Sequence, residues 1–483
     1  MATAYQKRIA AKPKAFQVLP VELNQQIAFY LEHDKDFVNL RASCRAIKDA
    51  IDADDSLWFK RFHAVYDPPS DLDPDSPGYK AKIRELYQKR ARHLLLYPVR
   101  FRIGNTKKEQ ETLRLVAGLL NDSYNGPAQV RKQYETGEVY VTCRNIDAFK
   151  KFVSRSGIIE HMFRPRPTRN HKANGNCDAA MNKYNPALAA VQLMCAPTIL
   201  KHPGNIYGFE DSQMWAYSTI RTAPIFGGFN KTEINMEWVL HVMNFFKYHI
   251  GKSDERTLFE PFNRLESNEK PSYWQGSLHN GPSDLGVHWK GTYSYLDREE
   301  MRLIRSGAHH GHVLIDHNVD HGDASIQTMN ITFPDSTNFN WPAVFEHHLR
   351  STTSDDHPPR TRAQRRSGEV IQFQRFNQRF QAVGYDDEDF NAAGWLNELP
   401  NQHGIAGWKR MTMMKYFEDG NGGWDNNALW AYEGVVLPGG RLMLGRWWSP
   451  ENPVPNREVY TGPFIFWNTD ASCDRIECDL HHP

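Results

Sequence analysis

A run of imidazole and carboxylate side chains is the part of this sequence that most resembles a reactive site. The segment HHGHVLIDHNVDHGD supplies two kinds of ligand that borderline metal ions accept: His309, His310, His312, Asp316, His317, Asp320, His321 and Asp323. It contains no H-E-x-x-H and no histidine pair one turn apart on a predicted helix. Asp316-x-Asn318-x-Asp320 begins like a calcium loop, but position six is His321, not Gly, and position twelve is Gln327, not Glu. The pattern favours a polar strand and turn, and we expect no metal site.

Motifs for covalent catalysis are missing from the sequence. It has no G-x-S-x-G for a serine nucleophile and no G-x-x-x-x-G-K-[ST] for nucleotide phosphates. The carboxylates of Asp386-Asp387-Glu388-Asp389 fall in a predicted turn, where mutual repulsion favours solvent. Six cysteines without a C-x-x-C pair suit reduced thiols better than zinc or disulfides. We therefore expect no catalytic residue, no cofactor and no enzyme activity of the chain itself.

The first 66 residues have the pattern of three short helices. Pro20 and Glu22 suit a helix start, and Leu23, Ile27 and Leu31 then fall four apart on one face. A second helix is predicted with the apolar stripe Phe37, Leu40, Cys44, Ile47 and Ile51, and a third with Leu57, Trp58 and Phe62. A unit this small cannot bury both faces of its helices, so part of the apolar surface should need a partner.

The order of residues in this segment resembles the F-box family along its whole length. LPVELNQQIAFYL, FVNLRASCRAIKDAI and SLWFKRF carry the resemblance, although Ala46-Ile47 stands where a pair with Trp is common in that family. The resemblance implies docking to the Skp-type adaptor of a cullin-RING ubiquitin ligase. The apolar positions that match the docking surface are Leu19, Pro20, Leu23, Ile27, Leu31 and Leu40.

The middle of the chain is predicted to be mainly helical. Residues 67–78, DPPSDLDPDSPG, are typical of a linker, and residues 79–270 show repeated apolar spacings of three and four. The pattern fits best a purely structural role for these helices. We recognise no family resemblance in this region.

Residues 271–483 are predicted to form an antiparallel β-barrel. Aromatic-rich segments alternate with Gly, Pro and Asn turns, and seven or eight strands without intervening helices favour closure, which removes exposed edges. The order of Gly, Trp and Tyr motifs is similar to the C-terminal barrels of fungal-type F-box proteins, in which the barrel selects the substrate. A polar insertion at residues 334–368 is expected to be a mobile loop. Arg446, Trp447 and Trp448 form a candidate substrate patch, because Arg and Trp dominate interface hot spots, with filling of the barrel core as the alternative.

Charge and hydropathy exclude other classes of protein. Among 483 residues, 58 Lys and Arg nearly balance 57 Asp and Glu, so no general attraction to nucleic acid is expected. The longest apolar stretch is too short to span a membrane, and no signal peptide is recognised, so we expect a cytoplasmic or nuclear protein.

Together these features predict an α+β multidomain protein that acts as the substrate-recognition subunit of an SCF-type E3 ubiquitin ligase. The barrel would bind the target, and the N-terminal helices would bind the adaptor. Two alternatives stay open: a small-molecule or glycan-binding barrel with a helical cap, and an F-box protein that acts outside a ligase. The sequence does not identify the substrate or the oligomeric state.

Overall fold

The computed structural model describes most of the chain. The described residues are 18–95, 106–127, 129–132, 139–158, 185–202, 204, 206–219, 221–228, 231–253, 257–281, 285–309, 314–320, 326–334, 342–349, 377–419, 423–426, 428–450 and 459–470. Within them, no helix is long and apolar enough to cross a membrane.

Residues 21–65 form four helices, where the sequence predicted three. They are α2 (Val21–Phe29), α3 (Asp34–Ser43), α4 (Arg45–Asp52) and α5 (Ser56–Val65). The apolar spacing across residues 37–51 suggested one helix, but Cys44 has φ −156° and ψ 163° and separates α3 from α4. Periodicity missed this break because Phe37 and Ile47 both face the same core on either side of it.

The middle of the chain is mainly helical, as predicted. Its helices are α6 (Tyr79–Arg90), η1 (Ala91–Leu95), α7 (Thr106–Asn121), α8 (Arg144–Ser156), α10 (Pro186–Met194), α11 (Ala196–Ile199), α12 (Phe209–Ala216), α13 (Met236–Gly251), α14 (Phe259–Arg264) and η2 (Ser267–Glu269). Two small antiparallel sheets interrupt them: β1 (Gln129–Lys132) with β2 (Val139–Thr142), and β3 (Phe226–Gly227) with β4 (Glu233–Ile234). Nearly every residue of α13 is buried, so this helix is the centre of the layer.

The C-terminal region is a closed antiparallel barrel of eight strands in the order β10-β11-β12-β5-β6-β7-β8-β9. The strands are β5 (His288–Tyr293), β6 (Gln327–Thr332), β7 (Asn377–Asp386), β8 (Glu388–Glu398), β9 (Lys409–Tyr416), β10 (Trp430–Val436), β11 (Leu442–Trp448) and β12 (Thr461–Asn468). Closure confirms the predicted barrel. The sequence did not identify β8 as a strand, whereas the turn before it, with Asp387 at φ 57°, was expected.

Side chains on alternate positions of the strands face two different cores. Interior positions such as Met413, Met443 and Phe464 fill the barrel. Exterior positions such as Leu444 and Ile465 join the core of the helices, because α13 packs against β11 and β12. The region of continuous buried residues therefore runs from the N-terminal helices to the barrel wall, and the predicted domain bounds stay predictions.

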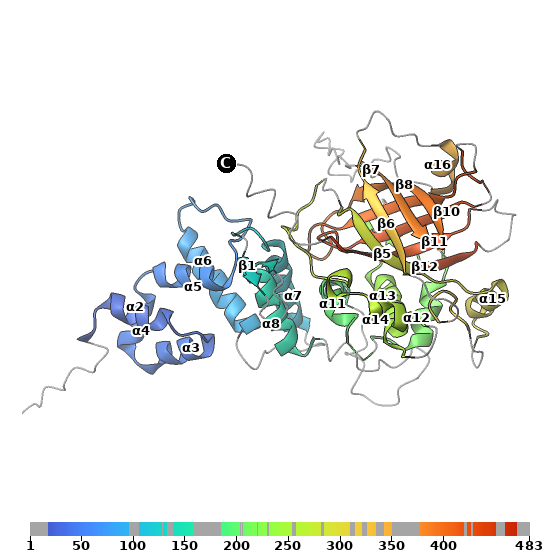
Figure 1. Ribbon diagram of the computed structural model, residues 1–483. Helices are drawn as coiled ribbons and strands as arrows, with labels where there is room; N and C mark the ends of the chain where they lie inside the picture. Colours follow the sequence, from blue (N-terminus) through green and yellow to red (C-terminus); the bar gives the residue numbers. More distant parts are fainter. Residues whose placement is uncertain are drawn as a thin grey trace, which may run out of the picture.

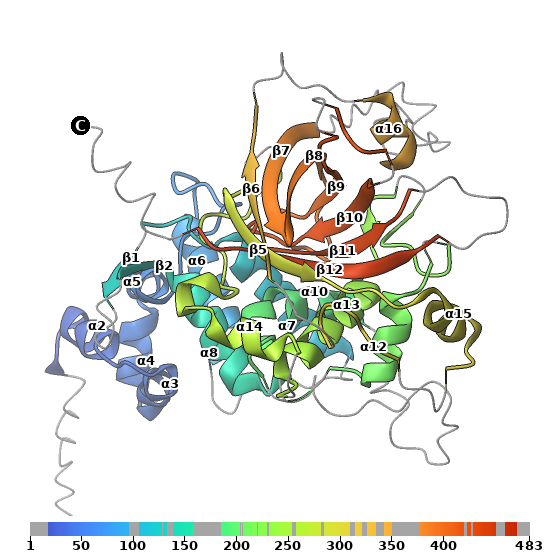
Figure 2. The ribbon, with the colours of Figure 1, turned by 45° about the vertical axis from the view of Figure 1, so that its right-hand side comes forward.

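Figure 1 shows the resulting arrangement, with α11–α14 lying along one side of the barrel and α2–α5 at the far end of the molecule. Figure 2 shows the same elements after a 45° turn, with α16 (Ala343–Leu349) above the barrel. One end of the barrel docks on α7, where the Asn121 side chain accepts a hydrogen bond from the Ala406 backbone N–H, at 3.0 Å.

The insertion predicted at residues 334–368 contains a helix, and its mobility stays a prediction. Its residues 343–349 form α16, which packs against β9 and β10 with Phe345 and Leu349 buried against Met414 and Trp448. The sequence analysis missed this helix because the residues around Phe345 and Leu349 are mostly polar. Residues 335–341 and 350–368 lie outside the described residues.

Candidate functional site

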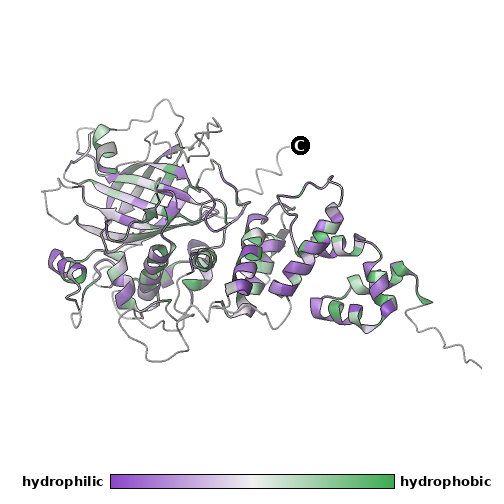
Figure 3. Cartoon of the chain, turned by 180° about the vertical axis from the view of Figure 1, so that it is seen from behind, coloured by the Kyte–Doolittle hydropathy of each residue, from purple (hydrophilic) through white to green (hydrophobic). Residues whose placement is uncertain are grey.

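Exposed apolar side chains gather on the N-terminal helices. Leu23 and Ile27 of α2 retain 45% and 41% of their surface exposed. Among the described residues, more than half of the large exposed hydrophobic side chains lie in one short segment: Val18, Val21, Leu23, Ile27, Phe29, Tyr30 and Val38. Figure 3 shows apolar residues, coloured green, on these helices at the end of the chain away from the barrel. A concentration of this kind marks an interaction surface.

The local sequence explains why α2 turns its larger side chains outward. Its buried positions are Asn24 and Ala28, which are small or polar, so the helix lies close to its neighbours. Gln25 donates a hydrogen bond from Nε2 to the carbonyl oxygen of Ala50 at 2.9 Å, which fixes α2 against α4. Leu23 and Ile27, four residues apart, therefore stack on the opposite, solvent-facing side.

The other positions predicted for the same surface differ in how exposed their side chains are. Pro20 is exposed and caps the start of α2, while Leu19 is half-buried. Leu31 and Leu40 are half-buried and pack against the core of the helices. Val18, Val21, Tyr30 and Val38 belong to the exposed surface but were missed, because they lie off the four-residue ladder that the sequence analysis followed.

A buried arginine holds this surface in place. Arg61 of α5 lies 5% exposed in its side chain and makes an ion pair with Asp34 at 3.1 Å. Its Nη1 donates to three carbonyl oxygens at the end of α2, at 2.9–3.3 Å, those of Ala28, Phe29 and Leu31. Carbonyl groups at a helix C-terminus lack helical partners and carry partial negative charge, so a cation there stabilises the end of α2.

Comparison with known families agrees with this geometry. Residues 16–64 match the model of the F-box-like family. The chain therefore carries an F-box-like domain near its N-terminal end. No curated protein and no solved structure matched the chain. The exposed apolar surface on α2 therefore lies inside the F-box-like segment, and we call it the F-box ridge, defined by Leu23, Ile27 and the exposed residues named above.

The candidate substrate patch, Arg446, Trp447 and Trp448, lies in the interior. Arg446, Trp447 and Trp448 are 0%, 3% and 9% exposed. Trp447 fills the barrel, Trp448 lies under α16, and Arg446 faces the helices, with its guanidinium 4.8 Å from the ring of Trp238. Burial lowers the pKa of Arg446 to about 9. A substrate contact by these three residues stays a prediction, and their burial favours the alternative that they fill the core.

In the His- and Asp-rich segment, the carboxylate of Asp316 has a structural role. Asp316 is fully buried and accepts hydrogen bonds from Gln213 Nε2 at 2.8 Å and Tyr217 Oη at 2.9 Å, and it pairs with His249 at 3.1 Å. These contacts join the segment to α12 and α13. His310, His312, His321 and Asp323 lie outside the described residues.

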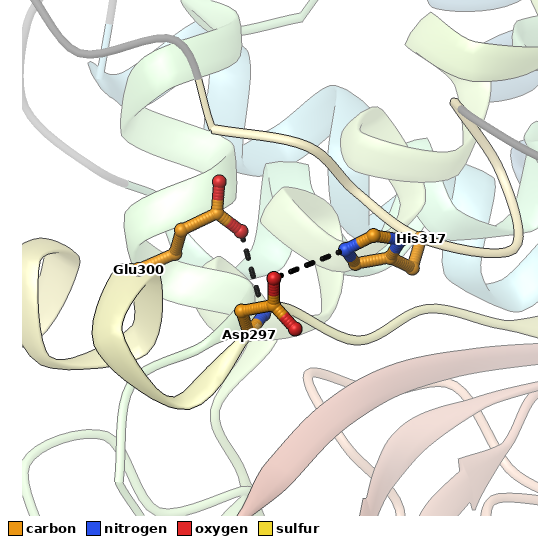
Figure 4. Close-up of side chains that lie close together, drawn as sticks. All are labelled: Asp297, Glu300 and His317. Carbon is orange, nitrogen blue, oxygen red and sulfur yellow. Dashed lines mark hydrogen bonds and ion pairs between the residues drawn. The ribbon is translucent and has the colours of Figure 1, made fainter.

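Asp297, Glu300 and His317 come close enough for their ligand atoms to lie within 4.8 Å of one another (Figure 4). Their positions follow from the start of α15 (Arg298–Ser306), where Asp297 and Glu300 form a reciprocal capping box. The Asp297 backbone N–H donates to Glu300 Oε2 at 3.3 Å, and the Ile315 N–H donates to Glu300 Oε1 at 3.2 Å. Helix capping thus accounts for the cluster without a ligand.

Proposed function

We propose that this F-box protein is the substrate-recognition subunit of an SCF-type E3 ubiquitin ligase. The F-box ridge, with Leu23 and Ile27 at its centre, binds the Skp-type adaptor together with the flanking residues Leu19, Pro20, Leu31 and Leu40, and the C-terminal barrel binds the target protein. The observation that carries the proposal is the exposure of Leu23 and Ile27 within residues 16–64.

The energetics of the F-box ridge support a protein partner. Burial of apolar surface contributes about 25 cal/mol per Å², so covering several half-exposed Val, Leu, Ile and Tyr side chains supplies the driving force for a stable complex. Glu22 is the one charged residue of α2, so the centre of this surface carries little charge to desolvate. Interface centres with few charges and several aromatic or aliphatic side chains are typical of stable protein complexes.

The proposed mechanism is proximity, with no covalent chemistry by this chain. Tethering a target beside a loaded conjugating enzyme raises its effective concentration at the reactive thioester. The helices between the F-box ridge and the barrel set the distance between adaptor and target. The proposed places of action are the cytoplasm and the nucleus.

Size-exclusion chromatography of the full chain with a purified Skp-type adaptor tests the proposal. We expect co-elution with the wild type and its loss in the double variant Leu23→Asp, Ile27→Asp, because each new carboxylate would be desolvated in the interface. Met214→Asp is the matched control, since Met214 is also helical and 40% exposed but lies on α12.

Three outcomes separate the alternatives. Co-elution that survives the double variant would contradict the assignment of the F-box ridge. No complex with the wild type would favour the carrier of a small molecule or glycan. A complex that never ubiquitylates a co-purified partner, when cullin, RING and conjugating enzyme are supplied, would favour an F-box protein acting outside a ligase.

A further inference from the structure

One end of the barrel combines features of a binding site that neither the F-box ridge nor the barrel core explains. At this end β5, β7, β9 and β11 finish and β6, β8, β10 and β12 begin. It is the end next to α15 in Figure 1, away from α7. We call it the barrel mouth, defined by the residues at inward-facing positions there: Tyr293, Gln327, Asp386, Lys415, Phe417, Trp430, Trp447 and Tyr460.

A buried amide at the barrel mouth has no hydrogen-bond partner among the residues that the structure describes. Gln327 is 2% exposed, and neither its Oε1 nor its Nε2 forms a hydrogen bond. It shares the inward side of β6 with Met329, which lies in the barrel core, and it pairs with Gly291 of β5. Leaving a buried polar group unpaired is unfavourable, because its hydration is lost without a replacement hydrogen bond. A leucine would fill the same space without that cost, so the amide is better explained by a ligand than by the fold.

Aromatic rings form the wall beside this amide. Trp447 contacts Trp430 and Tyr460 with ring centroids 5.3 and 5.5 Å apart, and Tyr293 lies 6.1 Å from Trp447. Tyr293, Trp430 and Tyr460 are each partly exposed, so their edges reach the surface of the barrel mouth. The faces of such rings attract cations.

Carboxylates gather on two neighbouring β-hairpin connections at the same end of the barrel, between β7 and β8 and between β9 and β10. Residues 385–391 and 414–426 contain seven carboxylates and one basic residue, Lys415. The two turns touch, because Asn391 Nδ2 donates a hydrogen bond to Glu418 Oε1 at 3.1 Å. Asp387, Glu388 and Asp389 are exposed, and we call them the acidic rim.

The single lysine of these turns does not cancel the negative charge of the acidic rim. Lys415 is buried and forms an ion pair with Asp386, and its Nζ lies 4.2 Å from the ring centroid of Phe390. Burial lowers the pKa of Lys415 and raises that of Asp386, while their mutual attraction opposes both changes. The field at the barrel mouth therefore combines the exposed carboxylates of these turns with one exposed cation, Arg298, whose guanidinium lies 5.8 Å from the ring of Tyr460.

We propose that the barrel mouth binds a basic segment of a polypeptide. One Arg or Lys side chain of that segment passes between the aromatic rings and donates a hydrogen bond to Oε1 of Gln327, while the acidic rim attracts the neighbouring basic residues. As the recognition of a degradation target this rests on the proposed function, but binding at the barrel mouth requires no adaptor.

Fluorescence anisotropy with two labelled peptides tests the inference on the full chain. The probes are GSRGSRGSRG and its matched acidic form GSEGSEGSEG. We expect the basic peptide to bind with a Kd below about 100 µM, weakening several-fold between about 50 and about 200 mM salt, and the acidic peptide not to bind. Binding of both peptides alike, or of neither, would overturn the inference.

Variants locate the binding. The triple variant Asp387→Asn, Glu388→Gln, Asp389→Asn changes only exposed side chains, and we expect it to weaken binding of the basic peptide about tenfold or more. Gln327→Leu should weaken it about fivefold or more, with no loss of thermal stability. Thr328→Val is the matched control, because Thr328 is the next residue of β6 but faces solvent. Undiminished binding in either test variant would contradict a site at the barrel mouth.

The F-box ridge and the barrel mouth can be tested independently. The Leu23→Asp, Ile27→Asp variant should keep full binding of the basic peptide while losing the adaptor. Loss of peptide binding in that variant would contradict the barrel mouth as the site. A failure to bind the adaptor, with peptide binding intact, would contradict the ligase proposal alone.

Discussion

The stability of the helices that carry the F-box ridge should depend on Arg61. Replacing Arg61 by Met keeps much of the length of the side chain but removes every hydrogen bond that it donates. Besides Asp34 and the carbonyl oxygens at the end of α2, Arg61 Nε donates to Tyr87 Oη at 3.0 Å, and its guanidinium lies 4.3 Å from the ring of Phe37. The variant leaves a carboxylate that is 9% exposed without its cation.

The structure sets the size of the effect. Removing one member of a buried ion pair costs about 3–5 kcal/mol, because the other charge stays buried and unpaired. Arg84 provides the comparison, since it pairs with Asp52 at 2.8 Å and Asp55 at 3.1 Å but is 26% exposed. Exposed pairs contribute about 0–1 kcal/mol. Arg84→Met should therefore destabilise the same helices much less than Arg61→Met.

Hydrogen–deuterium exchange of peptides covering α2 and α3 measures the local opening free energy directly. A loss of about 3–5 kcal/mol in Arg61→Met corresponds to exchange about 100- to 4,000-fold faster, against less than about tenfold in Arg84→Met. Adaptor binding should weaken in parallel, because the F-box ridge is no longer held in place. Equal exchange in the two variants would refute the role given to the buried network.

Three further predictions concern packing and ionisation. A Cβ at Gly118 of α7 would meet nothing within 4 Å, whereas one at Gly445 would collide with the Glu433 carbonyl oxygen. Gly118→Ala should therefore raise the unfolding free energy by about 0.5–1 kcal/mol, and Gly445→Ala should lower it by about 1–3 kcal/mol or more. Urea denaturation measures both changes. Burial lowers the pKa of Lys247 to about 8, so the folded protein binds fewer protons than the unfolded chain between about pH 8 and 10.5. The unfolding free energy of the wild type, relative to that of Lys247→Met, should therefore rise by about 2–3 kcal/mol from pH 7 to pH 10. A difference in unfolding free energy that does not change with pH would refute this. Burial also raises the pKa of the Cys195 thiol, so iodoacetamide should label Cys195 only after unfolding, as peptide mass mapping would show.

Several features could be predicted from local sequence because short-range physics fixes them. The four-residue ladder of Leu23 and Ile27 gave the face of α2, and seven of the barrel strands were found from aromatic-rich segments between turns. The hairpin at 437–441 follows from Gly439 and Gly440, which have φ 85° and 66°. β8 was missed because its sequence, EDFNAAGWLNE, begins with charged residues and has small ones in the middle.

The sequence by itself determined that the N-terminal helices have more apolar surface than they can bury and that the C-terminal strands close on themselves. Both results depend on residue spacing, because the periodicity of a helix or strand places regularly spaced residues on one face of it. Only the tertiary structure decided that Arg446, Trp447 and Trp448 are buried and that the buried amide of Gln327 has no hydrogen-bond partner among the described residues. Those facts depend on the register of strands far apart in the chain and on which helices cover the barrel, and no local pattern contains that information.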